Sequence, residues 1–154
     1  IVVLQTFSKA WGMAGARLGM GFMHPRLAAI LNKVKFPYNV NKLTIREALQ
    51  RLEDIPEMQK RVKELVQERK RMEKELQNVH QVVHVYPSDA NFLLVKFRDA
   101  ATVMDFTQKQ GIILRDRSTQ PGCANAIRIT IGTPQENQAL LQALKNIDQH
   151  KSHS

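Results

Sequence analysis

The sequence predicts the tail of an α/β domain, followed by connecting helices and a small α+β domain. Two observations predict this fold class. Short β-rich runs alternate with helical patterns along the chain, and a long helical stripe separates an N-terminal strand region from a C-terminal region with the order strand, strand, helix. The expected limits are 1–37 for the end of the large domain, 38–80 for the connecting helices, 81–149 for the small domain and 150–154 for a disordered tail.

The N-terminal region combines β-rich and helical patterns. Its first residues, IVVLQTF, form an apolar run typical of a buried strand. Pro25 opens the segment PRLAAILNKV at the position where a helix tolerates proline. The expected elements are strands at 1–7 and 18–23, helices from Pro25 and at 42–52, a break at 54–56 and a long helix at 57–79.

The C-terminal region has shorter elements around small turns. Its last strand, AIRITIG, alternates: Ile127, Ile129 and Ile131 fall on one face, and Arg128 falls on the other. A guanidinium on the polar face of a strand is either an anion clamp or a surface charge. The expected elements are strands at 82–86 and 91–97, a helix at 100–110, the extended run GIILR, the strand AIRITIG and a helix that starts near Pro134.

The formal net charge of +9 raises the question of a nucleic-acid partner. The long helix at 57–79 holds seven of the 23 Lys and Arg residues together with five Glu, and among these Glu68 precedes Arg71 by three positions, as on a solvated helix face. The sequence has no zinc-finger spacing and no aromatic RNA-binding signature. We therefore expect no nucleic-acid partner, and a basic interaction module remains the non-enzyme alternative.

Composition also bears on the compartment. No uncharged apolar run approaches the roughly 20 residues that cross a bilayer. Cys123 is the single cysteine, so an intrachain disulfide is impossible. We expect a cytoplasmic protein without a membrane partner. Because the chain opens at Ile1, inside an expected strand, we also expect it to be a fragment.

The stretch TFSKAWGMAGARLG carries the main chemical signal. Thr6, Ser8, Lys9 and Arg17 supply two hydroxyls, an amine and a guanidinium around a glycine-containing turn. An amine can condense with an aldehyde, while hydroxyls and a guanidinium fork can bind a phosphate. Pyridoxal phosphate has both groups. The alternative is a lysine at a strand end that reaches solvent.

The extended stretch TFSKAWGMAGARLGMGF resembles the cofactor-lysine segment of the fold type I, pyridoxal-phosphate-dependent aminotransferases. The resemblance continues through FPYNVN, SDANFLLVKF, GIILRDRS and AIRITIGT. This set, in this order, is similar to the histidinol-phosphate aminotransferases of histidine biosynthesis. It covers nearly all of the chain except the terminal HKSHS.

The resemblance implies roles for the residues of the first motif. Lys9 is expected to form the Schiff base with pyridoxal 5'-phosphate, and Arg17 is expected to bind the cofactor phosphate. Ser8 and Thr6 are expected to help hold that phosphate.

The resemblance also implies substrate contacts. Arg128 is expected to grip the anionic group of the substrate, and Arg115 is expected to be a second anion contact. Asn91 matches a family position near the join of the two domains. For Asn91, ordinary turn chemistry is the alternative.

The implied reaction converts L-histidinol phosphate and 2-oxoglutarate to imidazole-acetol phosphate and L-glutamate. The alternatives are a related aminotransferase for aromatic or other amino acids, or a threonine-phosphate decarboxylase. The family forms homodimers, and its acidic partner of the pyridine nitrogen, its stacked aromatic ring and its phosphate loop lie upstream of the lysine segment. We therefore expect a homodimer for the full-length enzyme, and no activity from these 154 residues alone.

Overall fold

The computed structural model describes residues 1–151, with side chains to residue 147. The chain divides into two compact units, Ile1–Lys63 and Glu64–Ser154. This division falls inside the 38–80 segment that we expected to connect two domains, and the domain limits expected from the sequence stay predictions. The last helix continues to Lys151, and the rest of the expected tail at 150–154 lies outside the described residues.

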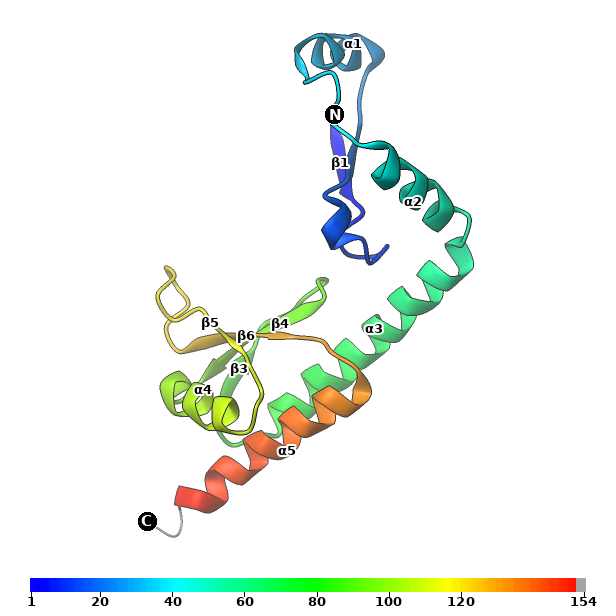
Figure 1. Cartoon of the computed structure of the whole chain (residues 1–154). Coiled ribbons are helices and arrows are strands. Elements are labelled where there is room, and N and C mark those ends of the chain that lie inside the picture. Colours follow the sequence, from blue (N-terminus) through cyan, green and yellow to red (C-terminus); the bar gives the residue numbers. More distant parts are fainter. Residues whose placement is uncertain (152–154) are drawn as a thin grey trace. The chain divides into compact units, whose positions relative to one another are not determined.

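The first unit contains a two-stranded antiparallel sheet and helices (Figure 1). The sheet pairs Val3 with Phe22 and Thr6 with Gly19, so the loop with the lysine motif joins two neighbouring strands. The expected helices in this region are confirmed. The elements are β1 (Val3–Thr6), the 3-10 helix η1 (Ala14–Ala16), β2 (Gly19–Phe22), α1 (Pro25–Val34), α2 (Lys42–Leu52) and the start of α3 (Ile55–Gln77).

The expected break at 54–56 is wrong in its extent. Helix α3 begins at Ile55, because Asp54 caps it: the Asp54 Oδ1 accepts a hydrogen bond from the Glu57 backbone N–H at 3.3 Å. Pro56 stands in the first turn, where its missing N–H removes no intrahelical bond. The break is therefore limited to the residues between α2 and α3.

The core of the first unit is small. Its buried residues are Phe7, Met13 and Ala48, and side chains such as Trp11 pack against them. The N-terminal strand, which we expected to be buried, is exposed: 77% of Leu4 is accessible. The first unit has too small a core to cover β1, so the apolar side chains of this strand stay accessible.

The second unit is a four-stranded antiparallel sheet in the order β3-β4-β6-β5 with helices (Figure 1). It confirms the α+β order expected from the sequence. The elements are the C-terminal part of α3, β3 (Val82–Val85), β4 (Phe92–Phe97), α4 (Ala100–Lys109), β5 (Arg115–Asp116), β6 (Ala126–Thr130) and α5 (Pro134–Lys151).

One face of this sheet forms the main core. Leu93, Val95, Ile127 and Ile129 are fully buried and cluster with apolar residues of α3, α4 and α5. The alternation expected for AIRITIG is confirmed, since Arg128 falls on the opposite face of β6. The core therefore fixes which face of the sheet can carry a polar site.

Candidate active site

Lys9 lies in the loop between β1 and β2 and is exposed. Its carbonyl oxygen accepts a hydrogen bond from the Gly12 N–H at 2.9 Å, and Gly12 has a φ of +66°, a backbone conformation that favours glycine. The buried residues Phe7 and Met13 flank this turn, and the Met13 N–H donates to the Phe7 carbonyl at 3.0 Å. Lys9 is thus an exposed amine on a turn whose two ends are fixed by buried side chains.

The two hydroxyls of the motif are in contact. The Thr6 hydroxyl donates to the Ser8 Oγ at 2.9 Å, and the Ser8 backbone N–H donates to the Thr6 Oγ1 at 3.0 Å. The contact between the two hydroxyls uses one of their two protons, so the other can be donated elsewhere. The structure therefore brings Thr6 and Ser8 together beside Lys9, in an arrangement that suits a bound phosphate.

Arg17 adopts a left-handed backbone conformation, with a φ of 51°. A non-glycine residue in this region stores strain on the order of 1 kcal/mol, and such strain is concentrated at functional sites. One terminal nitrogen of the exposed guanidinium donates to the Ala14 carbonyl at 3.0 Å, which uses one of its five N–H donors. Arg17 is therefore held over the η1 turn, on the same β1–β2 connection as Lys9.

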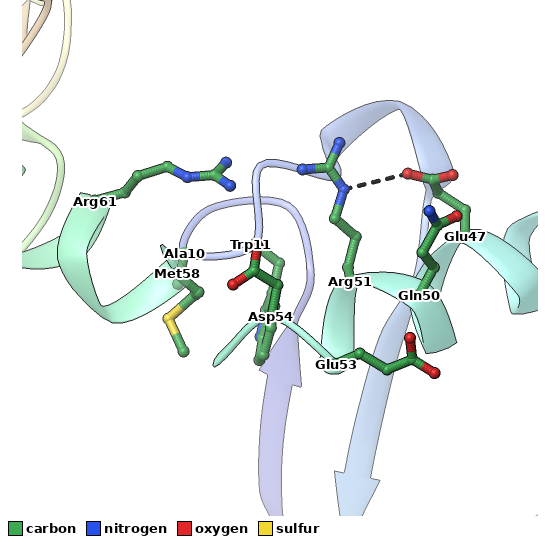
Figure 2. A pocket seen from close by; sticks show the side chains of 9 residues that line it. All are labelled: Ala10, Trp11, Glu47, Gln50, Arg51, Glu53, Asp54, Met58 and Arg61. Atoms are coloured by element: carbon green, nitrogen blue, oxygen red, sulfur yellow. Dashed lines mark hydrogen bonds and ion pairs between the residues drawn. The ribbon is translucent and has the colours of Figure 1, made fainter. Parts of the chain in front are cut away.

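A hollow of about 390 Å³ adjoins this loop (Figure 2). Three of its charged residues already have local roles: Arg51 pairs with Glu47 at 3.2 Å, and Asp54 caps α3. Figure 2 shows this ion pair among the lining side chains. The four predicted cofactor residues do not line the hollow, so we assign it no part in the candidate site. Its lining residues are Ala10, Trp11, Glu47, Gln50, Arg51, Glu53, Asp54, Met58 and Arg61.

The two predicted anion-binding arginines are directly opposite each other in the second unit. Arg115 on β5 is the register partner of Arg128 on β6. Directly opposite residues of an antiparallel pair project from the same face, and like charges there repel each other. An anion between the two guanidinium groups would offset this repulsion. The structure thus brings together two residues that are 13 positions apart in the sequence.

Arg128 also has a local environment that favours an anion. Its guanidinium carbon lies 5.2 Å from the centroid of the Phe92 ring, within the range of a cation–π contact. Its Nε is buried without a hydrogen-bond partner among the residues that the structure describes. Because a buried N–H without an acceptor costs stability, this atom indicates a missing acceptor, such as an oxygen of a bound anion.

Asn91 lies immediately before β4. Its carbonyl oxygen accepts a hydrogen bond from the Ile131 N–H at 3.0 Å, which extends the β4–β6 ladder beyond the Phe92–Thr130 pair. The half-buried Asn91 is therefore held next to Phe92, the residue under Arg128.

The sequence analysis missed Phe92. The alternation in NFLLVKF could have indicated this position. Leu93 and Val95 are buried, so Phe92 projects from the other face of the sheet, as Arg128 does from β6. Lys9 and its neighbours belong to the first unit, and Arg128 and its neighbours belong to the second.

Two other classes of site are not found in the described part of the chain. No group of three or more His, Cys, Asp or Glu side chains there is placed to hold a metal ion. No described helix is both long and apolar enough to span a membrane.

The comparison with protein families agrees with the lysine motif. The family model "Aminotransferase class I and II" matches residues 1–144. The chain belongs to this family. It is 50% identical over 147 residues to a histidinol-phosphate aminotransferase of Parabacteroides distasonis, a match that covers 96% of this chain and 43% of the relative. The chain therefore spans less than half the length of this curated aminotransferase.

Solved structures agree on the fold type I architecture of the aminotransferases. The histidinol-phosphate aminotransferase from Clostridium acetobutylicum has a TM-score of 0.87 at 24% identity, over 97% of this chain and 46% of that chain. The enzyme from Sinorhizobium meliloti, solved with pyridoxal-5'-phosphate, has a TM-score of 0.81 at 24% identity, over 97% and 41% of the two chains. The predicted fold class is confirmed.

Proposed function

We propose that the full-length protein is a pyridoxal-phosphate-dependent transaminase that converts L-histidinol phosphate and 2-oxoglutarate to imidazole-acetol phosphate and L-glutamate. The observation that carries the reaction type is the lysine turn: Lys9 is exposed, its turn is fixed by buried residues, and the Thr6–Ser8 hydroxyl pair and Arg17 share the same loop. The 50% identity to a named histidinol-phosphate aminotransferase supports the choice of substrates.

The residues of the loop suit pyridoxal 5'-phosphate. When bound, this cofactor supplies an aldehyde that links to amines and a ring that withdraws electrons from the substrate carbon. Lys9 would attach it, and Arg17, Ser8 and Thr6 would hold its phosphate through a guanidinium and two hydroxyls. The Thr6–Ser8 hydroxyl contact and the strained Arg17 backbone support this assignment.

The chain's own residues have two tasks in the reaction. The Lys9 amine would act as the general acid and base that removes the proton from the substrate carbon and returns it. Arg128 would hold the phosphate of one substrate and the carboxylate of the other, because a guanidinium grips either anion at two points. Arg115, opposite Arg128 in the sheet, would be the second anion contact. Asn91 would contact the substrate beside them.

The compartment and the oligomeric state of the full-length enzyme are also part of the proposed function. We propose a cytoplasmic homodimer in which the second subunit completes each site. Membership of the aminotransferase family supports small-molecule substrates, and we propose no nucleic-acid or membrane partner.

Replacing Lys9 tests the proposed function. In the full-length enzyme, Lys9→Ala should remove the visible absorbance of the bound cofactor and the adduct that borohydride traps. It should lower turnover by on the order of a thousandfold or more, because attachment and proton transfer are both lost. The control is Lys33→Ala, since Lys33 is an exposed lysine in α1 of the same unit. A trapped adduct on another lysine in the Lys9→Ala protein would overturn the assignment.

A substrate panel separates the alternatives. The wild-type full-length enzyme should transfer the amino group of histidinol phosphate faster than that of aromatic amino acids, and it should release no CO₂ from threonine phosphate. A faster reaction with either competitor would replace the proposed substrate. Salt-dependent retention of nucleic acid on filters would favour a basic binding module instead.

A further inference from the structure

Arg69 is a buried arginine on α3. Its side chain is 8% exposed, whereas Lys70, the next residue of this helix, is exposed. It falls in the same helical stripe as Leu65 and Met72, which contact the main core. A charged group in this stripe loses its hydration, so its polar contacts must explain its presence.

The contacts of Arg69 converge on one turn. One terminal nitrogen donates to the Ala90 carbonyl at 2.8 Å, and the other lies 3.6 Å from the Asp89 carboxylate. That carboxylate is fully exposed, so the ion pair contributes little to stability. The Nε is buried without a hydrogen-bond partner among the described residues. The strong, well-placed contact is therefore the hydrogen bond to the Ala90 carbonyl.

The turn that Arg69 holds leads directly into the candidate substrate site. Within it, the Ser88 hydroxyl donates to the Phe92 carbonyl at 2.6 Å and accepts from the Ala90 N–H at 3.1 Å. Arg69 fixes the turn from the helix, and Ser88 fixes it from within. The two residues that follow are Asn91 and Phe92, the residue under Arg128.

We propose that Arg69 is a positioning residue, which anchors the turn at 87–90 to α3 and so fixes Asn91 and Phe92 beside Arg128. The inference rests on the proposed function for its substrate, but its structural part does not. An apolar residue would pack in this stripe at no desolvation cost, so stability alone does not account for an arginine here. A long side chain with several donors can, by contrast, reach a backbone carbonyl 21 residues away in the sequence.

The test uses the full-length enzyme with Arg69→Met, which keeps an apolar stem, and Arg69→Lys, which keeps one donor group. The matched control is Lys70→Met, which removes a charge from the next, exposed residue of α3. Amide hydrogen exchange is measured by peptide, and steady-state kinetics are measured with histidinol phosphate. Cofactor absorbance reports whether the lysine site is intact.

Arg69→Met should speed exchange in the peptide that covers 87–92 while α3 and α4 keep their protection. It should raise the KM for histidinol phosphate on the order of tenfold with a smaller change in kcat, and Arg69→Lys should restore part of the loss. Combined with Asn91→Ala, its effect on kcat/KM should be less than additive, because both act through one turn. Lys70→Met should match the wild type.

Unchanged exchange at 87–92, or a loss of protection throughout the second unit, would overturn the positioning role. Fully additive effects with Asn91→Ala would overturn it as well. The exchange measurement needs no turnover, so it decides the role of Arg69 even for an enzyme that prefers another amino donor. A wild-type enzyme without activity on histidinol phosphate would instead refute the proposed function.

Discussion

The surroundings of Arg128 support its proposed role as a substrate contact. The apolar alternation of β6 turns it away from the core, the Phe92 ring lies against its guanidinium, and its Nε has no partner among the described residues. Arg115 faces the same side but is exposed. We therefore expect Arg128 to contribute more than Arg115 to the binding of an anion between them.

Alanine at these arginines should separate the two contributions. In the full-length enzyme, Arg128→Ala should cost on the order of 2 to 5 kcal/mol in kcat/KM, because the substrate anion would be left desolvated and unpaired. Arg115→Ala should cost less, since water can replace an exposed contact. Cofactor absorbance should persist in both.

The measurement is steady-state kinetics with both substrates. Arg98→Ala, which removes an exposed arginine just after β4, is the control. Wild-type rates with histidinol phosphate in the Arg128→Ala enzyme would show that the anion is held elsewhere.

At the scale of elements, one side-chain amide joins the end of β6 to two helices. Asn137 on α5 is buried, and its amide donates to the Gly132 carbonyl and accepts from the Gly132 N–H, both at 3.0 Å. The same amide nitrogen donates to the Glu68 carboxylate on α3 at 3.0 Å. Arg71 donates to that carboxylate at 2.6 Å. The strand that carries Arg128 is thereby tied to α3 and α5.

This junction should depend on pH through Glu68. The hydrogen bond from Arg71, together with that from Asn137, lowers the pKa of Glu68 below its ordinary value of 4.5, against the opposing effect of burial. Because this pKa is lower in the folded than in the unfolded chain, the ionised Glu68 carboxylate stabilises the fold. This contribution is fully present above about pH 4.5 and is lost as the pH falls through the folded-state pKa. Acid should therefore weaken the attachment of β6 to α3.

Glu68→Gln isolates this contribution. The substitution should lower the free energy of unfolding at pH 7 by on the order of 1 kcal/mol, and the difference from the wild type should shrink as the pH falls below about 4.5. Urea denaturation at pH 7 and at acid pH measures it. Glu64→Gln removes one charge from an exposed position of the same helix and serves as the control. A difference that stayed constant with pH would contradict the role of the Glu68 charge.

At the scale of the whole molecule, the first unit exposes much of its apolar surface. Its buried core consists of three residues. The sheet has two strands, both with unpaired edges, which are surfaces for pairing or aggregation. The large exposed apolar residues of this unit include Val3, Leu4, Phe22, Ile30, Leu31, Val34, Phe36 and Tyr38.

We predict that this 154-residue chain, purified alone, binds pyridoxal phosphate weakly and does not transaminate. The three-residue core stabilises the unit around the Lys9 turn only weakly, and the family's acidic partner of the pyridine nitrogen, which keeps the ring electron-withdrawing, is expected upstream of this segment. A coupled assay for glutamate measures turnover.

Activity should be restored by adding the part of the relatives that this chain does not cover, since the chain spans 43% of one such relative. Transamination by the 154-residue chain alone would refute the prediction. It would show that another group meets the electron demand of the cofactor.

The sequence by itself determined what depends on neighbours along the chain. Pro25 marked the start of α1, the apolar stripe at 57–79 located most of α3, and alternation in AIRITIG decided which face of β6 holds Arg128, because side-chain direction follows from backbone geometry. The lysine motif placed Thr6, Ser8, Lys9 and Arg17 around one connection between two strands for the same reason, since all four lie within twelve residues.

Only the tertiary structure decided what depends on contacts between distant segments. The register of β5 against β6 places Arg115 opposite Arg128, and helix packing buries Arg69 against the turn before Asn91. Local patterns place Arg69 in an apolar stripe, but they do not say which carbonyl it reaches. The exposure of the first strand likewise follows from the small core beside it, because burial is a property of what packs against a segment and not of its own residues.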